Sequence, residues 1–238
     1  MTKVWSLTST ANGARTVDKI KKLSKAPPKK RYGCKEEPLF SKLPIDHVVI
    51  DTLHLFLRIS DVLINLLIMD LLREDGIKRS KIDKIDQSTE NCIVVYECFL
   101  NEKCQISFQW FTLNSKLEYR DLTGPEKNRL FQAIKIPVLF PNLPKNEDIQ
   151  RLWMSFYHLI NQLKTDCDGD TFKEDSQNWV RLFCSVYQTK HVTPYIHAFG
   201  MHVHEFLHLY GNLCKFSQQG LEKLNDTTTL HYLRGTNH

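Results

Sequence analysis

The longest apolar pattern in the chain runs from Asp51 to Gly76, with leucine and isoleucine on most sides of a helical projection. Its length is sufficient for a membrane span, but six polar residues would then lie in lipid, where each is costly. A helix buried inside a protein therefore fits better. The six residues are Asp51, His54, Arg58, Asp61, Asn65 and Asp70.

Further helices are predicted wherever apolar and aromatic residues recur at helical spacing. One begins at Thr123-Gly-Pro-Glu126, where a hydroxyl, an early proline and a glutamate three residues on resemble a capping box, and it ends before Pro137. The others are a short helix over residues 14–25 and longer helices over 147–164, 173–188, 194–210 and 217–233.

Short β-type segments interrupt this helical pattern. The run from His47 to Ile50 is β-branched, and residues 92–121 contain three strand-like stretches, over 92–96, 105–111 and 116–119. We therefore expect a mainly α fold with a small β-rich insert at about 92–121.

The first 45 residues form a separate, basic segment. Residues 1–35 contain ten Lys or Arg and one acid, Asp18, whereas the remaining 203 residues contain 22 basic and 26 acidic residues. Five prolines and glycines between Pro27 and Pro44 oppose regular structure. We predict a flexible arm over 1–45 and a helical domain over 46–238. The arm's phosphate-contact or nuclear-import candidates are Lys25, Lys29, Lys30 and Arg31; the alternative is a solvated tail without a partner.

Four polar residues of the long apolar helix share one narrow seam. At 100° per residue they span only about 60° of the helix circumference. A solvated face would be broader, so we predict that the seam faces other side chains, either as a structural network or as the wall of a site. Its members are His54, Arg58, Asp61 and Asn65.

A second polar cluster occupies the helix predicted over 194–210. His204-Glu-Phe-Leu-His208 matches HExxH, whose spacing places two imidazoles on one helix face for zinc and leaves Glu205 to activate water. Glu222 could serve as a third ligand, and His197 lies on the same face. A structural histidine cluster is the alternative interpretation, and we expect no zinc in the purified protein.

Localisation follows from the cysteines and the N-terminus. The seven cysteines are scattered and form no CxxC pair, which is typical of reduced thiols. The first residues lack the apolar core of a secretory signal. We expect a nuclear or cytoplasmic protein that is not secreted and has no membrane partner.

Two segments resemble DDE-type transposases of the eukaryotic hAT-like groups, in which a helical insertion interrupts an RNase H-like core. Asp51-Thr-Leu-His54 and the following leucines and Asp61 look like their CxxH segment, with Asp51 in the cysteine position. Gln218-Gln-Gly-Leu-Glu222 looks like the helix that supplies the last acidic metal ligand. The chain from about residue 33 also resembles uncharacterised transposon-derived proteins, including the segments 192–197 and 234–238.

The resemblance implies a fold made of the helical insertion and the last catalytic helix, with an incomplete core. It also implies catalytic roles for Glu222 and Asp51, and Mg²⁺ or Mn²⁺ in an intact parent enzyme, where carboxylates hold two ions against a DNA phosphate. For this chain alone we expect no cofactor. The expected partners are DNA, bound weakly and without sequence preference, and an amino-terminal catalytic portion or a second copy of the chain.

Three functional hypotheses follow. The first is a transposase-derived fragment that contacts DNA without cutting it unaided. The second is a zinc-dependent hydrolase that uses His204, Glu205 and His208. The third is a helical interaction protein without catalysis.

Overall fold

A computed structural model describes residues 16–31, 34, 36–37, 42, 48–78, 91–113, 116–218, 220, 223–225 and 227–228. The described chain is mainly helical with one small sheet, as expected. Its elements are α1 (Val17–Ser24), η1 (Pro28–Lys30), α2 (Thr52–Glu74), α3 (Cys92–Glu102), β1 (Trp110–Leu113), β2 (Lys116–Tyr119), α4 (Gly124–Ala133), α5 (Ile136–Leu139), α6 (Asn146–Gln162), α7 (Gly169–Tyr187), η3 (Thr189–His191), α8 (Pro194–Met201), α9 (Val203–Tyr210) and η4 (Cys214–Phe216).

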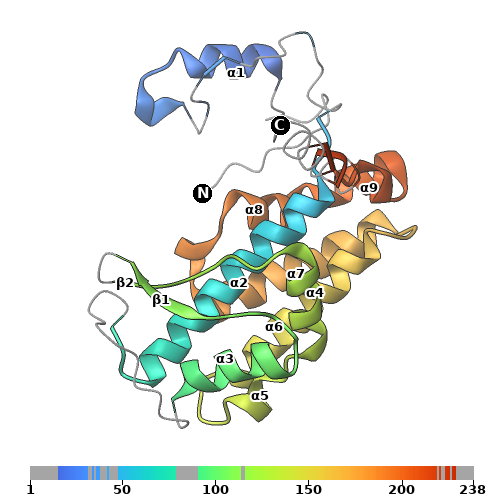
Figure 1. The fold of residues 1–238 in the computed structure, drawn as a ribbon. Coiled ribbons are helices and arrows are strands. Elements are labelled where there is room, and N and C mark those ends of the chain that lie inside the picture. Colours follow the sequence, from blue (N-terminus) through green and yellow to red (C-terminus); the bar gives the residue numbers. More distant parts are fainter. Residues whose placement is uncertain are drawn as a thin grey trace, which may run out of the picture.

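Helix α2 crosses the whole bundle (Figure 1) and contacts α3, α4, α6 and α8. Asp51 caps it by accepting from the backbone N–H groups of Leu53 and His54, at 3.0 and 3.3 Å. The apolar residues Leu55, Ile59 and Leu63 have no exposed surface. The predicted buried helix is therefore confirmed, and no helix among the described residues combines the length and apolarity needed to cross a membrane.

Helices α6 and α7 pack side by side, and α8 and α9 both contact α7. The centre of this packing is aromatic: the Phe156 ring centroid lies 5.5 Å from that of Trp179 and 5.7 Å from that of Phe199. Trp179 satisfies its buried indole N–H by donating to the Leu152 carbonyl oxygen at 2.9 Å. The buried residues of α6, α7, α8 and α9 form one hydrophobic core with those of α2.

The β-rich insert is smaller than predicted, because its first stretch is helical. Residues 92–96 open α3, where Ile93, Tyr96 and Leu100 are fully buried at helical spacing. The Asp75 carboxylate, at the end of α2, accepts from the N–H groups of Cys92 and Ile93, at 2.7 and 3.0 Å. Packing and this tertiary cap outweigh the β preference of the valines.

The sheet is a single antiparallel hairpin in which Trp110 pairs with Tyr119 and Leu113 with Lys116. Residues 105–109 have no regular structure, so the predicted strand over 105–111 forms only from Trp110 onward. Trp110 is 7% exposed and Leu117 1%, whereas Phe111 and Leu113 on the opposite face are 46% and 56% exposed. The hairpin therefore covers the core with one face only.

Three other boundaries differ from the sequence prediction. Residues 48–50 form no strand, and His47 lies outside the described residues. Helix α7 starts at Gly169, four residues early, because the Asp168 carboxylate accepts from the Thr171 N–H at 2.8 Å. The predicted helix over 194–210 is two helices that meet at His202. The change of direction there lets both halves pack against α7.

The ends of the chain are described only in part. In the arm, α1 agrees with the predicted short helix, and η1 is the one other helical turn among the described residues before position 48. Of the helix predicted over 217–233, the described residues 220, 223–225 and 227–228 are helical, and Glu222 lies outside the described residues. All seven cysteines are free thiols.

Candidate functional site

The polar seam of α2, which we predicted to face other side chains, does so only in part. The Arg58 side chain is 59% exposed, and Asn65 is exposed. Leucine and isoleucine make up almost all of the buried surface of α2, where Ser60 is the one buried polar residue, so Arg58 and Asn65 lie outside the core. His54 is half-buried and pairs with Asp51, and Asp61 makes a contact with another helix.

That contact joins Asp61 to a lysine that sequence reasoning missed. Lys127 of α4 has a side chain only 4% exposed, and its Nζ lies 2.6 Å from Asp61 Oδ1. Arg58 Nη1 lies 3.9 Å from the other carboxylate oxygen. Lys127 precedes Leu130 and Phe131 at helical spacing on the buried face of α4. This spacing in the sequence could have indicated that Lys127 is buried.

Asp51, the predicted catalytic residue, has its carboxylate engaged by several donors. In addition to capping α2, it pairs with His54 Nδ1 and accepts from the Gln218 N–H at 3.1 Å. Burial alone would raise the pKa of the Asp51 carboxyl, but the hydrogen bonds from His54 and these backbone groups hold it below its ordinary value. Asp51 therefore ties the C-terminal segment to the start of α2.

The HExxH residues are separated from His197 by the change of direction at His202. The His197 ring lies 5.3 Å from that of His202, and Glu205 lies 3.3 Å from His202 Nδ1. His208 Nε2 lies 3.4 Å from Asp170 Oδ1. Within the described part of the chain, no three His, Cys, Asp or Glu side chains are grouped to hold a metal ion.

His204 differs from the other histidines because it is 8% exposed and its Nδ1 has no hydrogen-bond partner among the described residues. Burial holds the pKa of His204 below its ordinary value, so the neutral ring is favoured. Its neighbour His208 packs against Gly169, where a Cβ atom would lie 2.7 Å from the ring. Only glycine fits there without displacing the imidazole.

The predicted DNA-contact residues lie on η1 or directly after α1 and η1. Lys25, Lys29 and Lys30 are exposed. Arg31 is only half-exposed, and its Nε donates to the Ala26 carbonyl oxygen at 2.6 Å. Lys25 Nζ lies 2.8 Å from Glu37 Oε1, an acidic partner that the sequence did not reveal.

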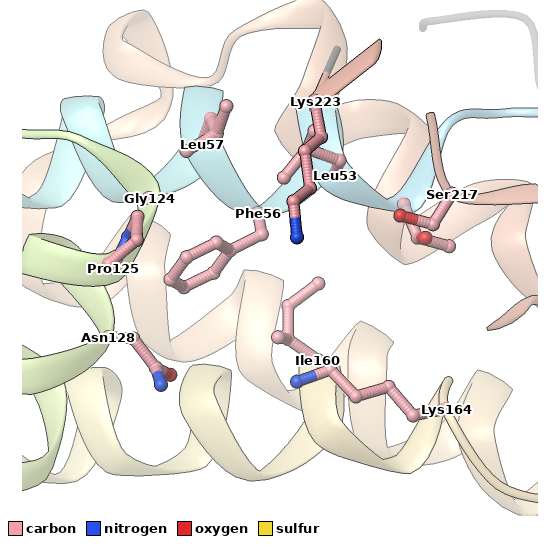
Figure 2. Close-up of a pocket in the computed structure, with 11 residues that line it drawn as sticks. Leu53, Phe56, Leu57, Gly124, Pro125, Asn128, Ile160, Lys164, Ser217 and Lys223 are labelled. Atoms are coloured by element: carbon pink, nitrogen blue, oxygen red, sulfur yellow. The ribbon is translucent and has the colours of Figure 1, made fainter. Parts of the chain in front are cut away.

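A cavity of about 540 Å³ lies between the start of α2, the start of α4, the end of α6 and the C-terminal segment (Figure 2). Its walls come from four separated stretches of the chain, so no local sequence pattern indicates it. The residues lining it are Thr52, Leu53, Phe56, Leu57, Gly124, Pro125, Asn128, Ile160, Lys164, Ser217 and Lys223.

Comparison with known proteins found no matching family model, curated protein or solved structure.

The Asp61–Lys127 pair predicts unequal effects of removing either partner. Asp61→Ala should cost about 2–3 kcal/mol of unfolding free energy, because it leaves the buried Lys127 ammonium unpaired. Lys127→Met should cost less than about 1 kcal/mol, since Asp61 is partly solvated and the side-chain stem is retained. Arg58→Gln, on the same carboxylate, is the control and should change stability by less than about 0.5 kcal/mol. Denaturant titration measures all three, and equal losses for Asp61→Ala and Lys127→Met would contradict this account.

The burial of His204 predicts that the folded chain loses stability at acidic pH. Its pKa is lower in the folded chain than the ordinary value of 6.5, so below that pH the unfolded chain takes up the proton first. The free energy of unfolding should therefore fall as the pH decreases from about 6.5 toward the folded-state pKa. His204→Phe should lose less stability than wild type between about pH 8 and about pH 5 in denaturant titrations. His158→Gln, at an exposed histidine of α6, is the control; an unchanged pH profile for His204→Phe would refute the assignment.

Proposed function

We propose that this chain is a DNA-binding protein that contacts the phosphate backbone through its basic N-terminal segment. The observation that carries the proposal is the exposure of Lys22, Lys25, Lys29 and Lys30 close together on α1, on η1 and between them. The residues after position 35 contain more acids than bases and would be repelled by DNA. This charge distribution directs a polyanion to one part of the molecule.

The arrangement of α1 supports this role. Its apolar residues Val17, Ile20 and Leu23 are half-buried, while Lys19 and Lys22 are exposed. The helix lies apart from the bundle formed by α2 and the later helices (Figure 1). A duplex could therefore approach α1 without contacting the acidic body.

Lysine contacts to phosphates position a protein on DNA without reading its sequence. Binding of this kind is driven by release of counterions and weakens steeply with salt. We therefore expect weak binding with little base preference.

We also propose that the chain derives from a DDE-type transposase and does not cut DNA alone. The sequence resemblance around Asp51 and Glu222 supports the descent. The engagement of Asp51 by donors from three residues supports the absence of cleavage, because a carboxylate used in this way is poorly placed to bind Mg²⁺ or Mn²⁺. Cleavage of supercoiled plasmid by the purified chain with either ion would contradict this second proposal.

The salt dependence of DNA binding tests directly whether the lysines of the arm contact DNA phosphates. If Lys25, Lys29 and Lys30 each contact a phosphate, replacing all three with glutamine should make the negative slope of log affinity against log salt less steep by about 2–3. The control replaces the exposed Lys103, Lys135 and Lys190 with glutamine, which gives the same net charge. Fluorescence anisotropy with unrelated duplexes across a salt series provides the slopes. Equal slopes in the two variants would mean that the arm does not bind DNA.

Glu37 should oppose DNA binding, because it occupies the Lys25 ammonium at 2.8 Å. Glu37→Gln frees that charge and should raise duplex affinity by roughly 2- to 5-fold at low salt. Glu36→Gln is a matched control, since it removes the same charge from the neighbouring position. The same anisotropy assay distinguishes the two. An equal gain in both variants would assign the effect to net charge and exclude a local role for the Lys25–Glu37 pair.

A further inference from the structure

The cavity beside α2 has a firm apolar wall. The Phe56 ring is nearly parallel to that of Phe156, at 10° and 6.4 Å between centroids, and lies 6.1 Å from the Phe131 ring. Leu53 of the same helix and Ile160 of α6 complete this wall. Because Phe56 and Ile160 pack in the main core, this part of the wall is formed before any ligand arrives.

Two cations line the same cavity. In Figure 2, the Lys223 ammonium group is directed toward the space beside Phe56 and Ile160, and the Lys164 ammonium group lies on the other side of Ile160. None of the described residues lining the cavity is acidic. Lys164 donates to Asn161 Oδ1 at 2.7 Å, but this amide carries no charge, so the cavity retains two positive charges. An anion bound in the cavity would be attracted by both charges.

Helix ends add little to this charge. Both α2 and α4 begin at the cavity, with their positive dipole ends nearby. However, carboxylates already cap both helices: Asp51 caps α2, and Glu126 accepts from the Thr123 N–H at 2.8 Å. The two lysines therefore supply the attraction for an anion.

Asn128 places a further polar group on the cavity wall. Tyr157 donates to Asn128 Oδ1 at 2.7 Å, which fixes the amide and leaves its NH₂ group as a donor. In Figure 2, Asn128 lies across the apolar wall from Ser217. A ligand in this cavity would thus meet apolar side chains along its body and donors near its edges.

We propose that this cavity binds a small amphiphilic anion, an apolar chain or ring that carries a carboxylate or a phosphate. Its volume of about 540 Å³ lies within the usual range of small-molecule sites. The apolar wall would cover the body of the ligand, and Lys164 and Lys223 would hold the anionic head. This site is separate from the basic arm and does not depend on DNA binding.

Calorimetric titration of the full chain with matched probes, used below their micelle concentrations, tests the proposal. Decanoate and decyl phosphate share the apolar chain and differ in the anionic head. Both should bind, and the stronger one identifies the preferred head group. Decyltrimethylammonium, with the same chain and the opposite charge, should bind at least about 10-fold more weakly, as should inorganic phosphate. Equal binding of the cationic probe, or of phosphate alone, would overturn the proposal.

Two variants locate the site. Lys164→Gln together with Lys223→Gln should weaken binding of the better probe by roughly 10-fold or more, because both head-group contacts are lost. Both lysines are exposed, so folding should be retained. Lys103→Gln with Lys190→Gln is the charge-matched control and should bind like wild type. Unchanged affinity in the first variant, or equal loss in the control, would also overturn the proposal. Since this assay contains no DNA, its failure leaves the DNA proposal intact.

Discussion

The need to cover α2 on several sides determines how the rest of the chain is arranged. A helix of 23 residues that is apolar around most of its circumference must be surrounded by other elements, and α3, α4, α6 and α8 provide that cover. Both ends of α2 also fix a second segment through a carboxylate. Asp51 holds the N–H of Gln218 at one end, and Asp75 holds the first N–H groups of α3 at the other. Hydrophobic burial therefore places the helices, and two acids fix the segments at their ends.

The described lysines lie in three different physical environments. Lys127 is buried and pairs with Asp61, so it is part of the fold. The lysines of α1 and η1 are exposed, and their attraction to a polyanion is long-range and screened by salt. Lys164 and Lys223 border a cavity with an apolar wall, where an anion would be partly removed from water and held more selectively. The same residue type therefore stabilises the fold at Lys127, and in our two proposals it attracts DNA in the arm and holds an anion at the cavity.

The spacing of the HExxH segment predicts its helix but not the contacts of its side chains. The sequence pattern correctly predicted that His204 and His208 lie on one helix, which is α9. It could not reveal that His204 is buried, that Glu205 lies beside His202, or that His208 packs over Gly169. These contacts come from α7 and from the change of direction at His202. Tertiary neighbours decide what a motif can do chemically.

By itself, the sequence determined the features that depend on neighbouring residues. These include the helix from Asp51, the capped start of α4, the helices over α6 and α7, the β2 strand, and the segregation of cations into the arm. Local pattern suffices there because capping, helical periodicity and charge act over a few residues. Only the tertiary structure decided that residues 92–96 are helical, that Arg58 and Asn65 are exposed, that Lys127 pairs with Asp61, and that four distant stretches enclose a cavity with two lysines. Each of these depends on contacts between segments far apart in the chain, which the spacing of residues along one segment does not encode.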